Sequence, residues 1–345
     1  MNTNYDAILL VSFGGPEKME DVVPFLANVT AGKNIPAERI RSVAEHYELF
    51  GGVSPINSYC RTLISSLRAE LLTAGLDIPI YWGNRNWHPL LPDAVQQMAE
   101  HGIKRALAFI TAAYSSYSSC RQYLENIESA RQIVNQASSL HVPEIHSISP
   151  YYNHPMFIDA NVENLLAALG EVSGDRQYTR VLFTAHSIPL SMARECAYEN
   201  QLKEVGALVA NKAAVKDWEL VFQSRSGDPK QPWLAPDIND YIRQIDNPTI
   251  QNLVVVPIGF ICDHMEVVYS LDEESAQIAR SCGLNFLRAA TAGSNRKFIH
   301  MVRDLILEHM TDKECAETCL PKCCPSGNQS GLLSKLHKEA TVIAT

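Results

Sequence analysis

Hydrophobic residues along the chain gather into short continuous runs rich in β-branched residues. Each run is followed by a loop of Gly, Ser, Asn or Pro and then by a stretch with helical periodicity. Strands that are buried on both faces read as continuous apolar runs, and their alternation with amphipathic helices is typical of parallel sheets covered on both sides. The strand-and-loop units span residues 7–15, 79–87, 105–119, 180–189, 219–227 and 252–264.

The six units form two sets of three, which predicts two similar α/β lobes that change over within residues 140–155. Ligands of such sheets bind at the carboxyl ends of the strands, so we expect the loops to face one cleft between the lobes. From about residue 311 the pattern stops, and the tail is polar and rich in cysteine. We therefore predict an N-terminal lobe (1–150), a C-terminal lobe (151–305) and a C-terminal extension (306–345).

Length and charge restrict the class of protein. A chain of 345 residues with 46% hydrophobic residues can bury a large core. The formal net charge of −9 disfavours nucleic acid and anionic membrane surfaces as partners. The apolar runs are shorter than the roughly 18 residues of a membrane-spanning helix, and the first five residues show no secretory signal. A cytoplasmic protein without a transmembrane segment is expected.

A histidine and a glutamate are the candidate catalytic residues. His186, in TAHSIP, ends a predicted buried strand, and Glu266 follows the strand at 253–261 in a helix for which Asp263 is the expected N-cap. Taken singly, they read as a structural histidine and a solvated acidic helix. Facing each other across a cleft, however, they could bind a divalent metal or move protons. Helical spacing adds to the Glu266 face the side chains of Tyr269, Ser270 and Glu273, with Glu274 beside them.

Aromatic and cationic residues populate the other predicted loops. In an average protein most of them would belong to the core or the surface. Their concentration at loop ends indicates a cleft for a large, flat, anionic ligand, with rings against its faces and Arg for its carboxylates. These residues are Tyr47, Phe50, Arg85, Trp87, Tyr114, Tyr117, Tyr123, Arg225 and Trp233.

Seven motifs together resemble the motif series of the ferrochelatases, in the same order, and are most similar to the bacterial type that metallates coproporphyrin III. The resemblance implies a two-lobed Rossmann-like chelatase fold with parallel four-stranded sheets flanked by helices. It also implies insertion of Fe²⁺ into a porphyrin between the lobes, which forms coproheme in haem biosynthesis. The motifs are LLVSFGGPE (9–17), HYELFGGVSPIN (46–57), YWGNRNWHP (81–89), YSSYSSCRQY (114–123), FTAHSIP (183–189), FQSRSGDPKQPWLAPD (222–237) and PIGFICDHMEVVYSLD (257–272).

The resemblance also implies roles for single residues. The family's catalytic histidine and glutamate map onto His186 and Glu266, which are also the expected ligands of the Fe²⁺ substrate. Two inner N–H protons of the porphyrin must leave as iron enters. We expect His186 to be the main proton acceptor and Glu266 its partner in iron delivery, although the residue types allow the reverse. The porphyrin-binding residues are expected to be Ser54, Tyr123, Phe13, Arg85, Trp87 and Trp233.

Two positions depart from the family pattern. Phe13 stands where some relatives have a tyrosine that gives the metal an axial oxygen, and Ser270 stands where many have an acid. The alternatives are the same reaction on protoporphyrin IX, or a non-catalytic tetrapyrrole or metal carrier on the same fold. The lack of an obvious apolar membrane-binding lip favours the four-carboxylate substrate, and retention of His186 and Glu266 disfavours the carrier. A monomer is expected, with a downstream haem-pathway enzyme as a candidate partner.

Nine cysteines in a cytoplasmic chain are better explained as thiols or metal ligands than as disulfides. A local zinc site is disfavoured because Cys323 and Cys324 are adjacent, unlike the usual spaced pairs. The resemblance implies a [2Fe–2S] cluster held by three tail cysteines and one remote cysteine. Cys120 is the expected remote ligand, and Cys319, Cys323 and Cys324 are the expected tail ligands, with Cys315 as an alternative.

Overall fold

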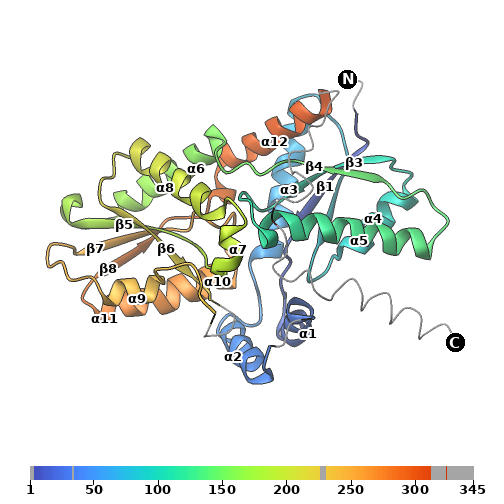
Figure 1. Ribbon diagram of the computed structural model, residues 1–345. Coiled ribbons are helices and arrows are strands. Elements are labelled where there is room, and N and C mark those ends of the chain that lie inside the picture. Colours follow the sequence, from blue (N-terminus) through green and yellow to red (C-terminus); the bar gives the residue numbers. More distant parts are fainter. Residues whose placement is uncertain (1–3, 33–34, 226–230, 312–323, 325–345) are drawn as a thin grey trace.

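The computed structural model describes residues 4–32, 35–225, 231–311 and 324. Its framework is a pair of parallel four-stranded sheets, one in each lobe, as predicted (Figure 1). Both sheets have the same strand order relative to the chain, β2-β1-β3-β4 and β6-β5-β7-β8. The strands are β1 Ala7–Ser12, β2 Ile80–Asn84, β3 Arg105–Ile110, β4 Glu144–Ser147, β5 Thr179–His186, β6 Trp218–Gln223, β7 Asn252–Val256 and β8 Asn285–Arg288.

Helices cover both faces of each sheet. Two of the helical segments, η1 and η3, are π-helices, in which the hydrogen bonds close over one residue more than in an α-helix. The α-helices are α1 Met19–Thr30, α2 Ala37–Glu48, α3 Ile56–Thr73, α4 Leu91–Glu100, α5 Gln122–Ala137, α6 Pro155–Gly170, α7 Leu190–Arg194, α8 Tyr198–Lys212, α9 Ile238–Arg243, α10 Met265–Val267, α11 Ala276–Ser281 and α12 Arg296–Thr311. The other helical segments are η1 Tyr117–Arg121, η2 Arg176–Tyr178, η3 Val268–Ser275 and η4 Ala292–Ser294.

One of the hydrophobic clusters is shared by both lobes. The outer face of the first sheet packs on α4 and α5, and the outer face of the second packs on α9 and α11. Between the sheets, Phe109 of β3, Phe157 of α6, Phe183 of β5 and Phe298 of α12 belong to a single buried cluster. A large apolar interface of this kind opposes relative motion of the lobes.

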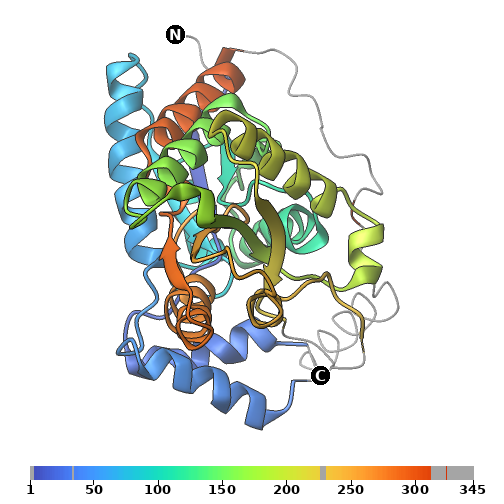
Figure 2. The same ribbon diagram turned by 90° about the vertical axis from the view of Figure 1, so that its left-hand side faces the viewer.

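The domain boundaries predicted at residues 150 and 305 stay predictions. The strands of the two sheets fall on opposite sides of residue 150. Helix α12, however, continues past residue 305 to Thr311 and packs against α3 of the first lobe. Helices α1 and α2 lie apart from the layers, at the lower end of the molecule in Figures 1 and 2, beneath the helices of the second lobe. No helix among the described residues is long and apolar enough to cross a bilayer.

Candidate active site

The candidate site lies at the carboxyl ends of the strands. Phe13 follows β1, Arg85 follows β2, and β5 and β6 end on His186 and Gln223, which pair directly across the sheet. Side chains of one strand alternate between the two faces of a sheet, so paired residues share a face. His186 and Gln223 therefore point to the same side, toward the segment that carries Glu266.

His186 and Glu266 meet as the sequence analysis expected. Nε2 of His186 lies 3.2 Å from Oε1 of Glu266, and the side chains are 29% and 44% exposed. Nδ1 of His186 lies 2.5 Å from the carbonyl oxygen of Ser187, a contact that requires a proton on Nδ1. The backbone thus fixes the ring orientation, and it leaves Nε2 as the atom that gains or loses a proton beside a carboxylate. Both side chains are open to a substrate.

Two side chains hold the main chain of Glu266. The backbone N–H of Glu266 donates to Nδ1 of His264 at 3.2 Å, and the side-chain amide of Gln223 donates to the carbonyl oxygen of Glu266. His264 is therefore the N-cap of α10. The prediction that Asp263 caps this helix is wrong, because that carboxylate is engaged by Arg288 and Thr291.

Electrostatics keep Glu266 charged. Burial raises its pKa, but the charge and hydrogen bond of His186, together with the charge of His264, outweigh burial and lower the pKa to about 2. Burial lowers the pKa of His264, and its Nδ1 carries no proton because it accepts the capping hydrogen bond. The site thus holds a permanent carboxylate between two imidazoles.

The helix after Glu266 differs from the α-helix that the sequence predicted. Residues Val268–Ser275 form the π-helix η3, so a face drawn with 3.6 residues per turn does not describe its side chains. Oγ of Ser275 donates to the carbonyl oxygen of Ser270 at 2.8 Å, so a side-chain donor serves a backbone carbonyl of this π-helix. The acidic face predicted for this helix is accordingly not supported.

Three of the predicted porphyrin contacts form a stack in the first lobe. The Arg85 guanidinium carbon lies 4.5 Å from the ring centroid of Tyr123 and 5.7 Å from that of Phe13. Nε of Arg85 also donates to Oδ1 of Asn126 at 2.7 Å. Tyr123 is buried. Arg85 therefore holds the aromatic rings in place. Its guanidinium group is already engaged by protein groups and is not reserved for a carboxylate of the ligand.

The other predicted contacts are spread around the site. Ser54 is buried against the loop after β1, where its N–H donates to the carbonyl of Pro16 at 2.8 Å. Trp87 meets Phe25 edge to face, with centroids 6.3 Å apart. Trp233 belongs to the second lobe, where it forms a bridge with Pro189. The fold brings Phe13, Arg85 and Tyr123 together and places Ser54 and Trp87 beside the loop after β1, where Phe25 contacts both Phe13 and Trp87. Trp233 lies in the second lobe.

Helices α1 and α2 reach across to the second lobe beside the site. The ring of His46 stacks on that of Tyr269, with centroids 3.7 Å apart. Met265, next to Glu266, packs in the same buried cluster as Phe25 and Tyr47. A role for Tyr47 in covering the segment that carries Glu266 has no signal in the chain, because it depends on how an N-terminal helix packs on the second lobe.

The structure describes two of the cysteines predicted to hold a cluster, Cys120 and Cys324. Cys120 lies in η1 with its side chain buried, and its Sγ is 3.3 Å from the carbonyl of Ser116. Cys324 is also buried. Cys315, Cys319 and Cys323 lie outside the described residues. Within the described part of the chain, no three His, Cys, Asp or Glu side chains gather as a metal site.

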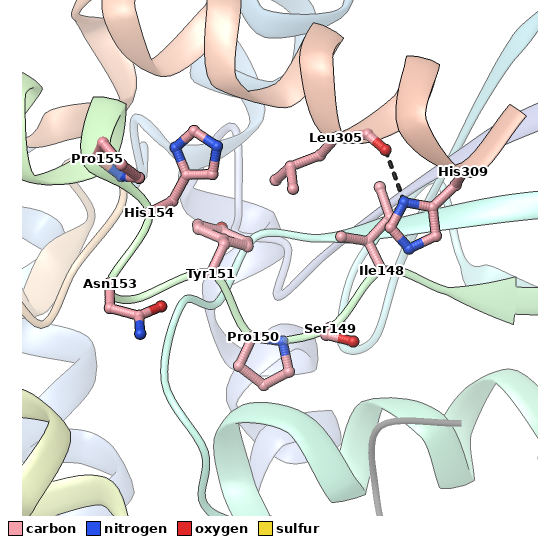
Figure 3. Close-up of a pocket in the computed structure, with 9 residues that line it drawn as sticks. All are labelled: Ile148, Ser149, Pro150, Tyr151, Asn153, His154, Pro155, Leu305 and His309. Atoms are coloured by element: carbon pink, nitrogen blue, oxygen red, sulfur yellow. Dashed lines mark hydrogen bonds between the residues drawn. The ribbon is translucent and has the colours of Figure 1, made fainter. Parts of the chain in front are cut away.

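A separate pocket of about 310 Å³ lies where the chain crosses between the lobes (Figure 3). The loop after β4 forms one wall, including Tyr151 and His154, and α12 forms the other, including Leu305 and His309. Nδ1 of His309 lies 2.7 Å from the carbonyl oxygen of Leu305, so that ring is tied to its own helix. None of the lining residues belongs to the candidate site.

Comparison with known sequences gives consistent results. The family model described as Ferrochelatase matches residues 5–310. A protein named "Ferrochelatase" from Rhodopirellula baltica is 50% identical over 307 residues, which are 89% of this chain and 86% of that protein. A "Coproporphyrin III ferrochelatase" from Streptomyces coelicolor is 42% identical and covers 93% of this chain and 94% of its own. One of the same name from Mycolicibacterium smegmatis is 44% identical, with 88% and 90% covered.

Solved structures agree on the fold. SirB from Bacillus subtilis superposes with a TM-score of 0.56 at 10% identity and covers 88% of this chain and 95% of its own. DR2241 from Deinococcus radiodurans, described as similar to chelatases, gives a TM-score of 0.52 at 14% identity and covers 89% of this chain and 56% of its own. At such identities the similarity concerns the two-lobed chelatase architecture alone.

Proposed function

We propose that this chain, which belongs to the ferrochelatase family, inserts Fe²⁺ into coproporphyrin III to form coproheme. The observation that carries the reaction type is the contact of His186 Nε2 with Glu266 Oε1 at 3.2 Å in a solvent-accessible position. The choice of porphyrin is supported by relatives at 42–45% identity that are named coproporphyrin III ferrochelatases. The relative at 50% identity is named for the reaction without a porphyrin.

The geometry matches what insertion requires. Fe²⁺ forms bonds to the pyrrole nitrogens, and two protons leave them, so the site must accept protons next to a metal ligand. With Nδ1 of His186 held by the Ser187 carbonyl, Nε2 is the atom that accepts a pyrrole proton. Glu266 stays a carboxylate, which offers oxygen to iron and stabilises the imidazolium that forms on His186. The pair thus serves both tasks.

The porphyrin is expected against the stack of Phe13, Arg85 and Tyr123. A phenyl ring at position 13 offers an apolar face and no metal ligand. Because the Arg85 guanidinium is already bound by Asn126 and stacked on Tyr123, we assign to it the ordering of this wall. Recognition of the propionate groups then falls to other donors.

Anaerobic Fe²⁺ insertion tests the proposal. The purified protein is assayed with coproporphyrin III and with protoporphyrin IX, beside His186→Ala and the control His101→Ala, which changes a histidine on the far side of the first lobe. Rapid metallation of coproporphyrin III that His186→Ala abolishes and His101→Ala retains is expected. Faster metallation of protoporphyrin IX would show that protoporphyrin IX, and not coproporphyrin III, is the preferred substrate. Binding of porphyrin without metallation would favour a non-catalytic carrier.

We also propose that Cys120 contributes to a [2Fe–2S] cluster with cysteines of the tail. Such a cluster needs four thiolates, which Cys120 and three tail cysteines can supply, and Cys120 and Cys324 are both buried. A cluster bound there would supply an electron-transfer or structural centre. No step of metal insertion is assigned to it.

We propose further that the protein acts in the cytoplasm as a monomer and passes coproheme to a downstream haem-pathway enzyme. Nine cysteines, an odd number, suit a reducing compartment. Size-exclusion chromatography with light scattering tests the monomer, and a dimer mass would contradict it.

A further inference from the structure

Arg288, the last residue of β8, uses every N–H of its guanidinium group. Nε and Nη2 donate to the two carboxylate oxygens of Asp272 at 2.5 and 2.9 Å. Nη1 and Nη2 donate to the two oxygens of Asp263 at 3.2 and 3.0 Å. Nη1 also donates to the carbonyl of Ala289 at 3.3 Å. Five donors in a planar fork fix the positions of both carboxylates.

The two carboxylates flank Glu266 in the chain. Asp263 comes three residues before Glu266, and Asp272 comes six residues after it, inside the π-helix η3. Arg288 itself is held in the sheet, where it pairs with Val255 of β7. The guanidinium therefore ties both ends of the Glu266 segment to a rigid strand. A short helix with irregular hydrogen bonding needs such external support to keep one conformation.

The same contacts affect where a cation can bind. Carboxylate oxygens are common ligands of divalent metals, and the side chains of Asp263 and Asp272 are 33% and 36% exposed. Arg288 is 16% exposed and engages all four of their oxygens. As long as it does so, its positive charge and its hydrogen bonds oppose the binding of a metal ion by these oxygens.

We propose that Arg288 is a positioning residue for metal insertion. It holds Asp263 and Asp272 so that Glu266 stays opposite His186, and it prevents these two carboxylates from capturing the divalent cation. The inference rests on the proposed function, because it deepens the role of the same site. It assigns a task to a residue that touches neither iron nor porphyrin.

The first test compares two arginines with similar contacts. Arg180 also binds a carboxylate with two hydrogen bonds, that of Asp217, but it lies at the other end of the second sheet, near the start of β5. Arg288→Gln is expected to lower kcat by about tenfold or more while the porphyrin Kd changes by less than about twofold. Arg180→Gln should leave kcat within about twofold. Arg288→Lys keeps the positive charge but cannot make the paired hydrogen bonds of a guanidinium group. Its kcat should lie between those of wild type and Arg288→Gln.

A second readout does not need turnover. Co²⁺ is titrated into the porphyrin-free protein and followed by its visible absorption. The wild type should show one site that is lost in Glu266→Gln. In Arg288→Gln that site should weaken and a second should appear at the released carboxylates. The second site should vanish when Asp272→Asn is added, whereas the low kcat should remain.

Two outcomes would overturn the inference: Arg288→Gln with wild-type kcat and wild-type Co²⁺ binding, or equal losses in the two arginine variants. If Arg288→Gln does not fold, Asp272→Asn alone must lower kcat with an unchanged porphyrin Kd. Failure of the proposed function is recognised separately, since wild-type protein would then metallate neither porphyrin while the Co²⁺ titration would still report on Arg288.

Discussion

The imidazole of His46 in α2 stacks on the phenol ring of Tyr269 in η3, with centroids 3.7 Å apart and planes 14° from parallel. This contact joins a helix of the first lobe to the π-helix that follows Glu266. It adds to the packing of Met265 against Phe25 and Tyr47, through which α1 and α2 cover the segment that carries Glu266.

Replacing Tyr269 by Ala should loosen this covering. Aromatic pairs contribute about 0.5–1.5 kcal/mol beyond the area they bury, so the free energy of unfolding should fall by about 1 kcal/mol or more. Porphyrin should also dissociate faster, as measured by stopped-flow fluorescence. The control is His101→Ala, which loses a tilted ring contact and a 2.7 Å hydrogen bond with Tyr81. Equal porphyrin dissociation rates in both variants would contradict a role of the stack at the site.

Replacing Gln223 by Leu should impair insertion through Glu266. The change removes the donor to the Glu266 carbonyl, and an unsatisfied buried acceptor costs about 1–3 kcal/mol. We expect kcat to fall by about tenfold with little change in porphyrin Kd. Thr184→Val is the matched control, because its buried hydroxyl has no hydrogen-bond partner among the described residues. A kcat that falls equally in both variants would argue against the specific role of Gln223.

The low pKa of Glu266 predicts a pH-dependent contribution to stability. The folded-state pKa of about 2 is below the ordinary value of 4.5, because His186 and His264 outweigh burial. The carboxylate therefore stabilises the fold above pH 4.5, and this contribution declines as the pH falls from there toward 2. Urea unfolding of wild type and Glu266→Gln at several pH values measures it. The difference should shrink between about pH 5 and pH 3, and a constant difference would exclude the ion pair as its cause.

The cluster proposal predicts a coloured protein. Anaerobically purified wild type should show visible absorption and contain about two iron and two sulfide per chain. Cys120→Ser should lose most of this absorption, whereas Cys282→Ser, which changes an exposed cysteine, should keep it. Colourless wild-type protein, or full absorption in Cys120→Ser, would refute the assignment of Cys120.

The loop after β7 approaches β5 so closely that a methyl group has no room. A Cβ at Gly259 would lie 2.5 Å from the Cβ of Ala185, the neighbour of His186. Gly259→Ala should therefore destabilise the protein by about 1–3 kcal/mol and reduce kcat by displacing the strand end. Gly170→Ala, at the end of α6 with open space around it, should be neutral or stabilising. Thermal unfolding and kcat of the two variants separate these expectations.

The weakest strand signals belong to β4 and β8. These are four-residue edge strands with exposed or half-buried positions, EIHS and NFLR. The central strands β1, β3, β5 and β7 show continuous apolar runs because they are buried on both faces, whereas β4 and β8 are short and only partly covered. From the residues alone the sequence therefore indicated three strands per lobe, and the fourth came from the family resemblance.

The alternating α/β pattern, the two lobes and the placement of His186 and Glu266 at strand ends can be predicted from the chain alone. These features depend on local burial, which leaves a periodic trace in the chain. The tertiary structure alone decided that His264 caps the Glu266 helix and that η3 is a π-helix. It also shows that the Arg85 guanidinium is bound by Asn126 and stacked on Tyr123. Gln223 reaches Glu266 across 43 positions and Arg288 reaches Asp263 across 25. Such contacts form only once distant segments pack together, so no local pattern encodes them.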